Sequence, residues 1–218
     1  IEGYSSKQWA RHPRELPASI IKRVPIRLTF DDNYFNDRYQ GIPIGGYTSI
    51  FEKMLDGIPV ELNTDFHLDR ETFLSKFDHV IFTGPIDSFF DYSLGHLEYR
   101  SLRFDHQLIN CSDFQGNAVI NHTEAQIPYT RTYEHKHFDM NFSADRSAVT
   151  YEYPDKWEPG KIEIYPVNTD ENQTLFSKYQ DMTKEFPNVT FGGRLGQYRY
   201  FDMHQVIGAA LEKVKSLA

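Results

Sequence analysis

A strand, a pair of glycines and an amphipathic helix follow one another near the end of this 218-residue chain, and this order constrains its fold most. Residues 188–191 (NVTF) predict a buried strand, Gly192 and Gly193 a turn, and Asp202 the cap of a helix. Behind the cap, apolar residues recur at the spacing of a helix that packs on a sheet: Met203, Val206, Ile207, Ala210, Leu211, Val214 and Leu217.

Such a strand, turn and helix start also suit a negatively charged or oxygen-rich ligand, because free backbone N–H groups and the helix dipole point there. Arg194, Tyr200 and Asp202 would lie at that place. The same residues equally fit a turn and a cap with no ligand, and the stretch alone does not decide between the two.

The charge balance and the cysteine count limit the partners of the chain. A net charge of −8, from 23 basic and 31 acidic residues, argues against nucleic acid and anionic membranes. The single cysteine, Cys111, excludes an internal disulfide and fits a reducing cytoplasm. No apolar run approaches the roughly 20 residues that span a bilayer. Because the chain begins at Ile1 without a methionine, we expect a fragment.

The periodicity changes along the chain. Helices are expected at residues 6–10, from 17 to the proline at 25, at 47–55 and 70–77, with strands at 60–62 and 79–83. From residue 97 a period of two predicts antiparallel strands at 97–104, 107–111, 118–121, 130–135, 149–153 and 162–167. Residues 170–185, 188–191 and 202 onward return to helix, strand and helix. The fold class is therefore α/β plus α+β, with an antiparallel sheet inserted into an α/β layer.

Arginine repeatedly occurs with tyrosine, a combination suited to phosphate because the guanidinium binds oxygens in pairs and the hydroxyl adds hydrogen bonds without charge. The instances are Arg23 with Tyr34, Tyr129 with Arg131, Tyr165 beside Pro166, and Arg194 with Tyr200. Two histidines, His135 and His137, would share one face of a strand while Glu134 points away. We interpret them as a hydrogen-bonded pair and expect no metal site.

Long motifs resemble UDP-galactopyranose mutases over almost the whole chain. They are YSSKQW (4–9), LPASIIKRVPIR (16–27), DDNYF (31–35), YQGIPIGGYT (39–48), TGPID (83–87), LEYRSLRF (97–104), PYTRTYEHKHF (128–138), YPVN (165–168) and GRLGQYRYFDM (193–203). The resemblance implies a cytoplasmic bacterial flavoprotein, an isomerase that interconverts UDP-galactopyranose and UDP-galactofuranose for surface glycan biosynthesis, and a possible homodimer. Reduced FAD would form a covalent adduct with the sugar through flavin N5.

The resemblance also implies a division of the chain. Residues 1–36 would form a helical segment with a mobile substrate flap, and residues 37–90 part of a Rossmann-like FAD-binding domain. Residues 91–167 would form the antiparallel substrate domain, and residues 168–218 the return to the FAD-binding layer.

Roles for single residues follow from matching motif positions. Arg23 and Arg131 are implied as catalytic residues that hold the diphosphate. Substrate-binding roles are implied for Tyr4, Trp9, Tyr34, Asn121, Tyr165, Tyr200 and Asp202. Arg194 and Met203 would face the flavin.

Two departures from the family pattern affect these expectations. Ala10 stands where the family usually has glycine after the tryptophan, and the glycine-rich segment that holds the FAD pyrophosphate is not among the 218 residues. We therefore expect this chain alone to bind FAD poorly and to be inactive. Two alternatives stay open: a non-catalytic nucleotide-sugar binding module, and another flavoenzyme of the amine-oxidase type.

Overall fold

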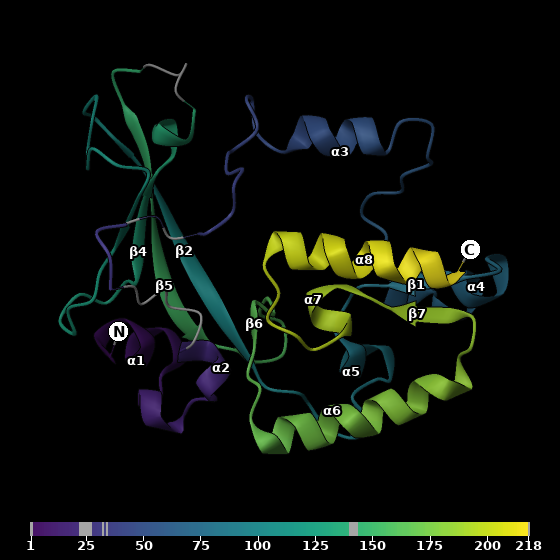
Figure 1. The fold of residues 1–218 in the computed structure, drawn as a ribbon. Helices are drawn as coiled ribbons and strands as arrows, with labels where there is room; N and C mark the ends of the chain where they lie inside the picture. Colours follow the sequence, from purple (N-terminus) through teal and green to yellow (C-terminus); the bar gives the residue numbers. More distant parts are fainter. Residues whose placement is uncertain (1, 22–27, 32, 34, 140–143, 218) are drawn as a thin grey trace. The chain divides into compact units, whose positions relative to one another are not determined.

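The computed structural model of the chain describes residues 2–21, 28–31, 33, 35–139 and 144–217 (Figure 1). Backbone contacts divide the chain into two compact units. Unit 1 comprises Ile1–Leu62 and Leu102–Asp155, and unit 2 comprises Asn63–Ser101 and Lys156–Ala218. Helices occur together with both parallel and antiparallel strands, which confirms a mixed fold class. The functional division into four segments stays a prediction.

Unit 1 combines short helices with antiparallel strands. Its described elements are α1 (Glu2–Trp9), η1 (Pro13–Glu15), α2 (Ala18–Ile21), α3 (Thr48–Met54), β3 (Val119–Asn121), β4 (Arg131–Glu134), η3 (His135–Phe138) and most of β5 (Ser147–Lys156) and β2 (Tyr99–Ile109). Within unit 1 the strand order of the sheet is β3-β4-β5-β2. The register places Asn121 opposite Arg131, and Arg131 opposite Glu152.

Unit 2 contains a short parallel sheet between helices. Its elements are η2 (Phe66–Leu68), α4 (Arg70–Lys76), β1 (Val80–Phe82), α5 (Ile86–Phe89), β6 (Tyr165–Pro166), α6 (Asp170–Met182), η4 (Thr183–Glu185), β7 (Val189–Phe191), α7 (Gly193–Gly196) and α8 (Met203–Leu217). β1 and β7 pair in parallel although more than a hundred residues separate them, with Ile81 opposite Thr190. Figure 1 shows α6 and α8 on opposite sides of this pair.

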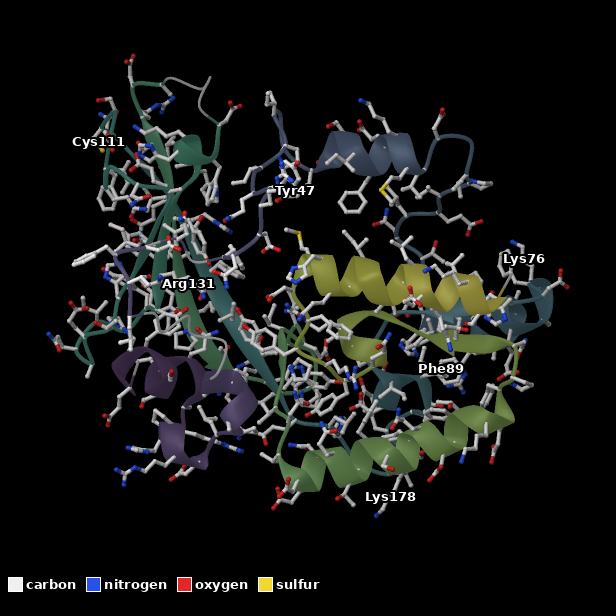
Figure 2. All side chains as sticks on the ribbon, in the orientation of Figure 1. Tyr47, Lys76, Phe89, Cys111, Arg131 and Lys178 are labelled. Atoms are coloured by element: carbon white, nitrogen blue, oxygen red, sulfur yellow. The ribbon has the colours of Figure 1, made fainter. Side chains whose placement is uncertain are left out.

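Aromatic rings fill the core of unit 2. Phe89 of α5 is 1% exposed, and its ring centroid lies 4.9 Å from that of Phe191 and 5.2 Å from those of Phe82 and Phe186 (Figure 2). Most of these contacts are edge to face, the arrangement that the ring quadrupoles favour. The apolar residues of 79–83 and 188–191 thus form strands because both supply one face to this core.

The turn after β7 depends on Gly193. Its φ of 72° lies in the left-handed region, which residues with a Cβ rarely adopt. From Gly193 the chain enters the single turn of α7, where the sequence had predicted only a turn at Gly192 and Gly193 before the helix cap. The predicted strand, glycine turn and final helix are otherwise confirmed.

The apolar stripe of α8 does not pack on the sheet as expected. Met203, Ile207, Leu211, Val214 and Leu217 are 46–65% exposed. The opposite side of the helix, with Ala209, Glu212, Lys213 and Ser216, faces the unit instead. The helical period was therefore predicted correctly, but the described residues do not bury the apolar face of α8.

Three further expectations were wrong in detail. Residues 60–62 follow a proline, pair with no described strand and are exposed. The strands expected at 97–104 and 107–111 form one strand, β2, because no glycine or proline interrupts their alternation. Residues 135–138 form the 3₁₀ helix η3 instead of continuing β4.

Replacement of Phe89 by alanine tests the aromatic core. We expect Phe89→Ala to lower the free energy of unfolding by about 3–5 kcal/mol, because it removes a buried ring and leaves a cavity. Urea denaturation followed by circular dichroism measures the change. Phe77→Ala is the matched control, since Phe77 is 47% exposed and should cost much less. Equal losses in the two variants would contradict the proposed core.

Candidate functional site

Three adjacent strands place the side chains around Arg131. Asn121 ends β3, Arg131 begins β4, and Glu152 lies opposite Arg131 on β5. Residues that lie directly opposite each other in an antiparallel sheet point to the same face. Tyr133, two residues after Arg131, shares that face because side chains alternate along a strand. We call Tyr4, Asn121, Arg131, Tyr133 and Glu152 the Arg131 cluster; Figure 2 labels Arg131.

The guanidinium of Arg131 is held on one side. Its Nε donates to Asn121 Oδ1 at 3.0 Å and its Nη1 to the Tyr133 hydroxyl at 3.3 Å. Nη1 also lies 3.6 Å from Glu152 Oε2. Nη2 has no hydrogen-bond partner among the described residues. The ring of Tyr4 lies 5.5 Å from the guanidinium carbon and covers the group.

Glu152 is the buried anion of this cluster, with its side chain 2% exposed. It accepts hydrogen bonds from Thr130 Oγ1 at 2.9 Å and from the Tyr133 hydroxyl. Burial is the largest influence on the pKa of Arg131 and lowers it, but Glu152, Tyr4 and Tyr133 together raise that pKa above its ordinary value. Arg131 therefore stays charged, as a buried carboxylate requires of its partner.

Tyr133 connects the two charged groups. Burial and the hydrogen bond to Glu152 raise the pKa of Tyr133 to about 12, so the hydroxyl keeps its proton at neutral pH. Sequence reasoning missed both Tyr133 and Glu152. The alternation of residues 131 and 133 could have indicated the tyrosine, whereas the glutamate follows only from the register between β4 and β5.

Removal of the Tyr133 hydroxyl tests this connection. We expect Tyr133→Phe to lower the free energy of unfolding by about 1–3 kcal/mol, because Glu152 loses a donor in a buried site. Urea denaturation measures the loss. The control is Tyr153→Phe on the same strand as Glu152, where Arg103 lies over the ring at 3.9 Å and the substitution keeps that ring. A Tyr133→Phe variant as stable as the control would contradict the bridging role.

A second cluster lies in unit 2 and consists of Arg194, Tyr165 and Tyr200; we call it the Arg194 cluster. The ring centroids of the two tyrosines are 5.0 Å apart, and the Arg194 guanidinium carbon lies 5.0 Å from the Tyr200 ring and 5.8 Å from the Tyr165 ring. Arg194 donates from Nε to the carbonyl of Phe201 at 3.2 Å and from Nη1 to that of Ile164 at 3.1 Å. Arg194 therefore connects the turn before α8 to the residue before β6 by hydrogen bonds. Its guanidinium also lies near the rings of both tyrosines.

The start of α8 carries two more predicted residues. The backbone N–H of Asp202 donates to the side chain of Gln205 at 2.8 Å, and its carbonyl accepts from the N–H of Val206. These two contacts are those of a residue at a helix start. Met203 is the first residue of α8 and is exposed.

The structure describes only some of the remaining predicted residues. Trp9 ends α1, the helix that also carries Tyr4, and is buried. Arg23 and Tyr34 lie outside the described residues, and their roles stay predictions. A cavity of about 820 Å³ opens in unit 2 between α6, β7 and α8, but no residue predicted for the site lines it.

The residues around His137 differ from expectation. Because η3 begins at His135, Glu134 and His137 are turned toward each other, with His137 Nε2 at 3.3 Å from Glu134 Oε2 and 3.3 Å from Asp113 Oδ1. His135 separately contacts Thr150 Oγ1 at 2.6 Å. The expectation that Glu134 points away from the histidines was therefore wrong for His137. The three side chains could offer ligand atoms to a metal ion within 4.8 Å of one another.

The carboxylate of Glu134 is already bound by protein donors. It accepts from the backbone N–H groups of Phe114 and Gln115 at 3.0 and 2.8 Å and from the Ser147 hydroxyl at 2.5 Å. Lys136 Nζ lies 3.2 Å away. Burial raises the pKa of Glu134, but these donors outweigh it and lower the pKa to about 2. The arrangement is that of a structural anchor for the loop before β3.

The pH dependence of stability tests this anchor. A carboxyl with a lowered pKa stabilises the fold above its ordinary pKa of 4.5, and the contribution disappears as the pH falls toward 2. We expect Glu134→Gln to cost about 2–3 kcal/mol at neutral pH, and we expect the difference from wild type to shrink below pH 4.5. Urea denaturation at several pH values measures both. Glu158→Gln, on the surface, should change little at any pH, and a constant deficit for Glu134→Gln would contradict the assignment.

Comparisons with known proteins give a consistent result. A family model described as UDP-galactopyranose mutase matches residues 1–200. A probable UDP-galactopyranose mutase of Klebsiella pneumoniae is 41% identical over 214 residues, 97% of this chain and 55% of that protein. A dTDP-fucopyranose mutase of Escherichia coli is 38% identical over 215 residues, 96% of this chain and 57% of that protein. The chain spans about half the length of the curated relatives that it matches.

A solved structure supports the fold. The crystal structure of a reduced UDP-galactopyranose mutase superimposes with a TM-score of 0.51 at 15% identity, and the match covers 65% of this chain and 42% of that one. At this identity the likeness concerns the fold alone. Separately, none of the helices in the described part of the chain has both the length and the apolar content that a membrane crossing requires.

Proposed function

Because this chain belongs to the UDP-galactopyranose mutase family, we propose that it binds the nucleotide-diphosphate part of UDP-galactose and serves the interconversion of the pyranose and furanose forms. The observation that carries this proposal is the Arg131 cluster. One edge of a permanently charged guanidinium is fixed by protein groups, and Nη2, which has no hydrogen-bond partner in the described part of the chain, would bind the ligand. The N–H groups of Nη2, carried by this positive charge, suit the oxygens of a diphosphate.

The surroundings of Arg131 support a bound anion. The chain has a net charge of −8, so a general positive field does not attract phosphates, and a local cation must do so. Tyr4 places an aromatic ring 5.5 Å from the guanidinium carbon, where the face of the ring favours a cation. Asn121 and Trp9, on β3 and α1, would contact the nucleotide end of the ligand. Arg23 would add a second positive charge.

The Arg194 cluster would contribute to the sugar and flavin parts. The nitrogens Nε and Nη1 of Arg194 donate to backbone carbonyls, so this side chain would supply positive charge and ring orientation rather than a free fork. Tyr165 and Tyr200 would offer hydroxyls to the sugar or phosphates, with Asp202 close in sequence. When bound, reduced FAD would supply the nucleophile that the described residues do not offer, and Arg194 and Met203 would face it.

The exposed face of α8 fits a place within a larger FAD-binding layer. Five exposed apolar residues on one helix side are typical of a surface that another element covers. The relatives are nearly twice as long as this chain, and the part of a full-length mutase that does not align with it would cover α8 and extend the β1–β7 sheet.

The homodimer that the family resemblance implies stays a prediction.

Calorimetric titration of UDP into the 218-residue chain tests the proposal. We expect wild type to bind UDP and Arg131→Lys to bind about tenfold more weakly, because lysine keeps the charge beside Glu152 but loses the planar fork. The control is Arg103→Lys on β2, which should bind like wild type. No binding by wild type, or equal affinities for the two variants, would contradict the proposed diphosphate site.

The same titration with dTDP separates two substrates. The dTDP-fucopyranose mutase of Escherichia coli is almost as similar to this chain as the Klebsiella protein, at 38% against 41% identity. Tighter binding of dTDP than of UDP would favour a deoxythymidine nucleotide sugar as the ligand of the same diphosphate site. Tighter binding of UDP would favour UDP-galactose.

A further inference from the structure

The ammonium group of Lys7 lies at the centre of four backbone carbonyls. Its Nζ is 2.8 Å from the oxygen of His122, 3.2 Å from that of Glu124, 2.9 Å from that of Ile127 and 2.8 Å from that of Tyr129. An ammonium has three protons, so four oxygens at these distances coordinate it as they would a monovalent metal ion. Burial, the largest influence, lowers the pKa of Lys7, while Glu124 opposes that change.

All four oxygens belong to the loop between β3 and β4. This loop closes with a hydrogen bond from the His122 N–H to the Thr130 carbonyl at 2.9 Å and one from the Ile127 N–H to the Glu124 carbonyl at 3.2 Å. Four carbonyl dipoles that point at one place repel one another unless a cation lies there. The conformation of the loop therefore depends on a positive charge, which Lys7 supplies from α1.

The loop joins the two strands that carry Asn121 and Arg131. Asn121 comes directly before His122, and Arg131 directly follows Thr130. On α1, Tyr4 lies three residues before Lys7 and so on the same side of the helix. A single ammonium thus ties the helix that carries Tyr4 to the hairpin that carries the guanidinium beneath its ring.

The close approach of α1 to the loop agrees with this connection. Gly3 lies one helical turn before Lys7, and a Cβ at Gly3 would lie only 2.3 Å from the carbonyl oxygen of Thr123. The helix therefore packs directly against the loop backbone, with no room for a side chain at Gly3.

We propose that Lys7 is a positioning residue of the diphosphate site, whose ammonium acts as a built-in monovalent cation, and that a potassium ion takes its place when the side chain is removed. The hydrogen bonds of the Lys7 ammonium go to the carbonyls of the β3–β4 loop. Lys7 holds the β3–β4 loop and α1 in the arrangement that brings Tyr4 over Arg131. This inference rests on the proposed function only in naming UDP as the ligand. The role of Lys7 in holding the loop does not depend on it.

The test uses Lys7→Ala in buffers of equal ionic strength containing choline, lithium or potassium chloride. Equal ionic strength keeps the screening of Arg131 constant, so the salts differ only in the cation. UDP affinity is measured by calorimetry, and loop order by the hydrogen exchange of the His122 and Ile127 amides. We expect Lys7→Ala to bind UDP about tenfold more weakly and to exchange these amides faster in choline or lithium, and we expect potassium to restore most of both.

Two further variants isolate the cation effect. Lys7→Met fills the space with an apolar chain of similar length, so it should show the loss without rescue by potassium. Lys178→Ala removes an exposed lysine on α6 in unit 2 and should change neither readout in any salt. Restoration of Lys7→Met by potassium would overturn the proposal. So would a failure of potassium to restore Lys7→Ala. UDP affinity and amide exchange like those of wild type for Lys7→Ala in choline would also overturn it.

The outcomes separate this inference from the proposed function. If wild type does not bind UDP, the proposed function fails, and the amide exchange in the three salts still decides the role of Lys7. Lys7→Ala could fail to fold in choline. In that case, folding that is restored by potassium but not by lithium would support the role of Lys7 as a built-in cation. A variant that stays unfolded in all three salts overturns it.

Discussion

The buried carboxylate of Glu152 is the interaction on which the candidate site depends. A carboxylate that is 2% exposed is costly unless it is fully hydrogen-bonded and paired with a positive charge. Thr130 and Tyr133 donate to it, and Arg131 supplies the charge. Because the carboxylate needs this partner, the guanidinium cannot leave the sheet without a large cost. The position of a group suited to phosphate is therefore a consequence of the core of unit 1.

The same constraint explains why the site is built from strands and one helix. Adjacent strands place Asn121, Arg131 and Glu152 in one row, so the guanidinium is held at two of its nitrogens before any ligand arrives. A group held in this way loses little conformational freedom on binding. α1 then adds the ring of Tyr4, and its place is set by the contacts of Lys7 with the β3–β4 loop.

Much of this arrangement could be predicted from local patterns, and the rest depends on long-range packing. The periodicity of the sequence was sufficient to predict α3, α4, α6 and α8 and the strands β1 and β7. The role of Arg131, which was inferred from a motif, stays a proposal. Glu152 could not be chosen among 31 acidic residues, because only strand register places it opposite Arg131. The four partners of Lys7 are backbone carbonyls, so the identities of the side chains could not predict them. The apolar stripe of α8 could be predicted from the sequence, whereas the exposure of that stripe could not.

The position of UDP relative to Arg131 can be determined from a crystal structure of the 218-residue chain with UDP bound. We expect the diphosphate oxygens to lie within hydrogen-bond distance of Arg131 Nη2, while Nε stays on Asn121 and Nη1 stays beside Tyr133 and Glu152. We further expect that the ring of Tyr4 still covers the guanidinium. UDP bound away from Arg131, or an Arg131 side chain that leaves Glu152 to reach the phosphates, would contradict the proposed diphosphate site.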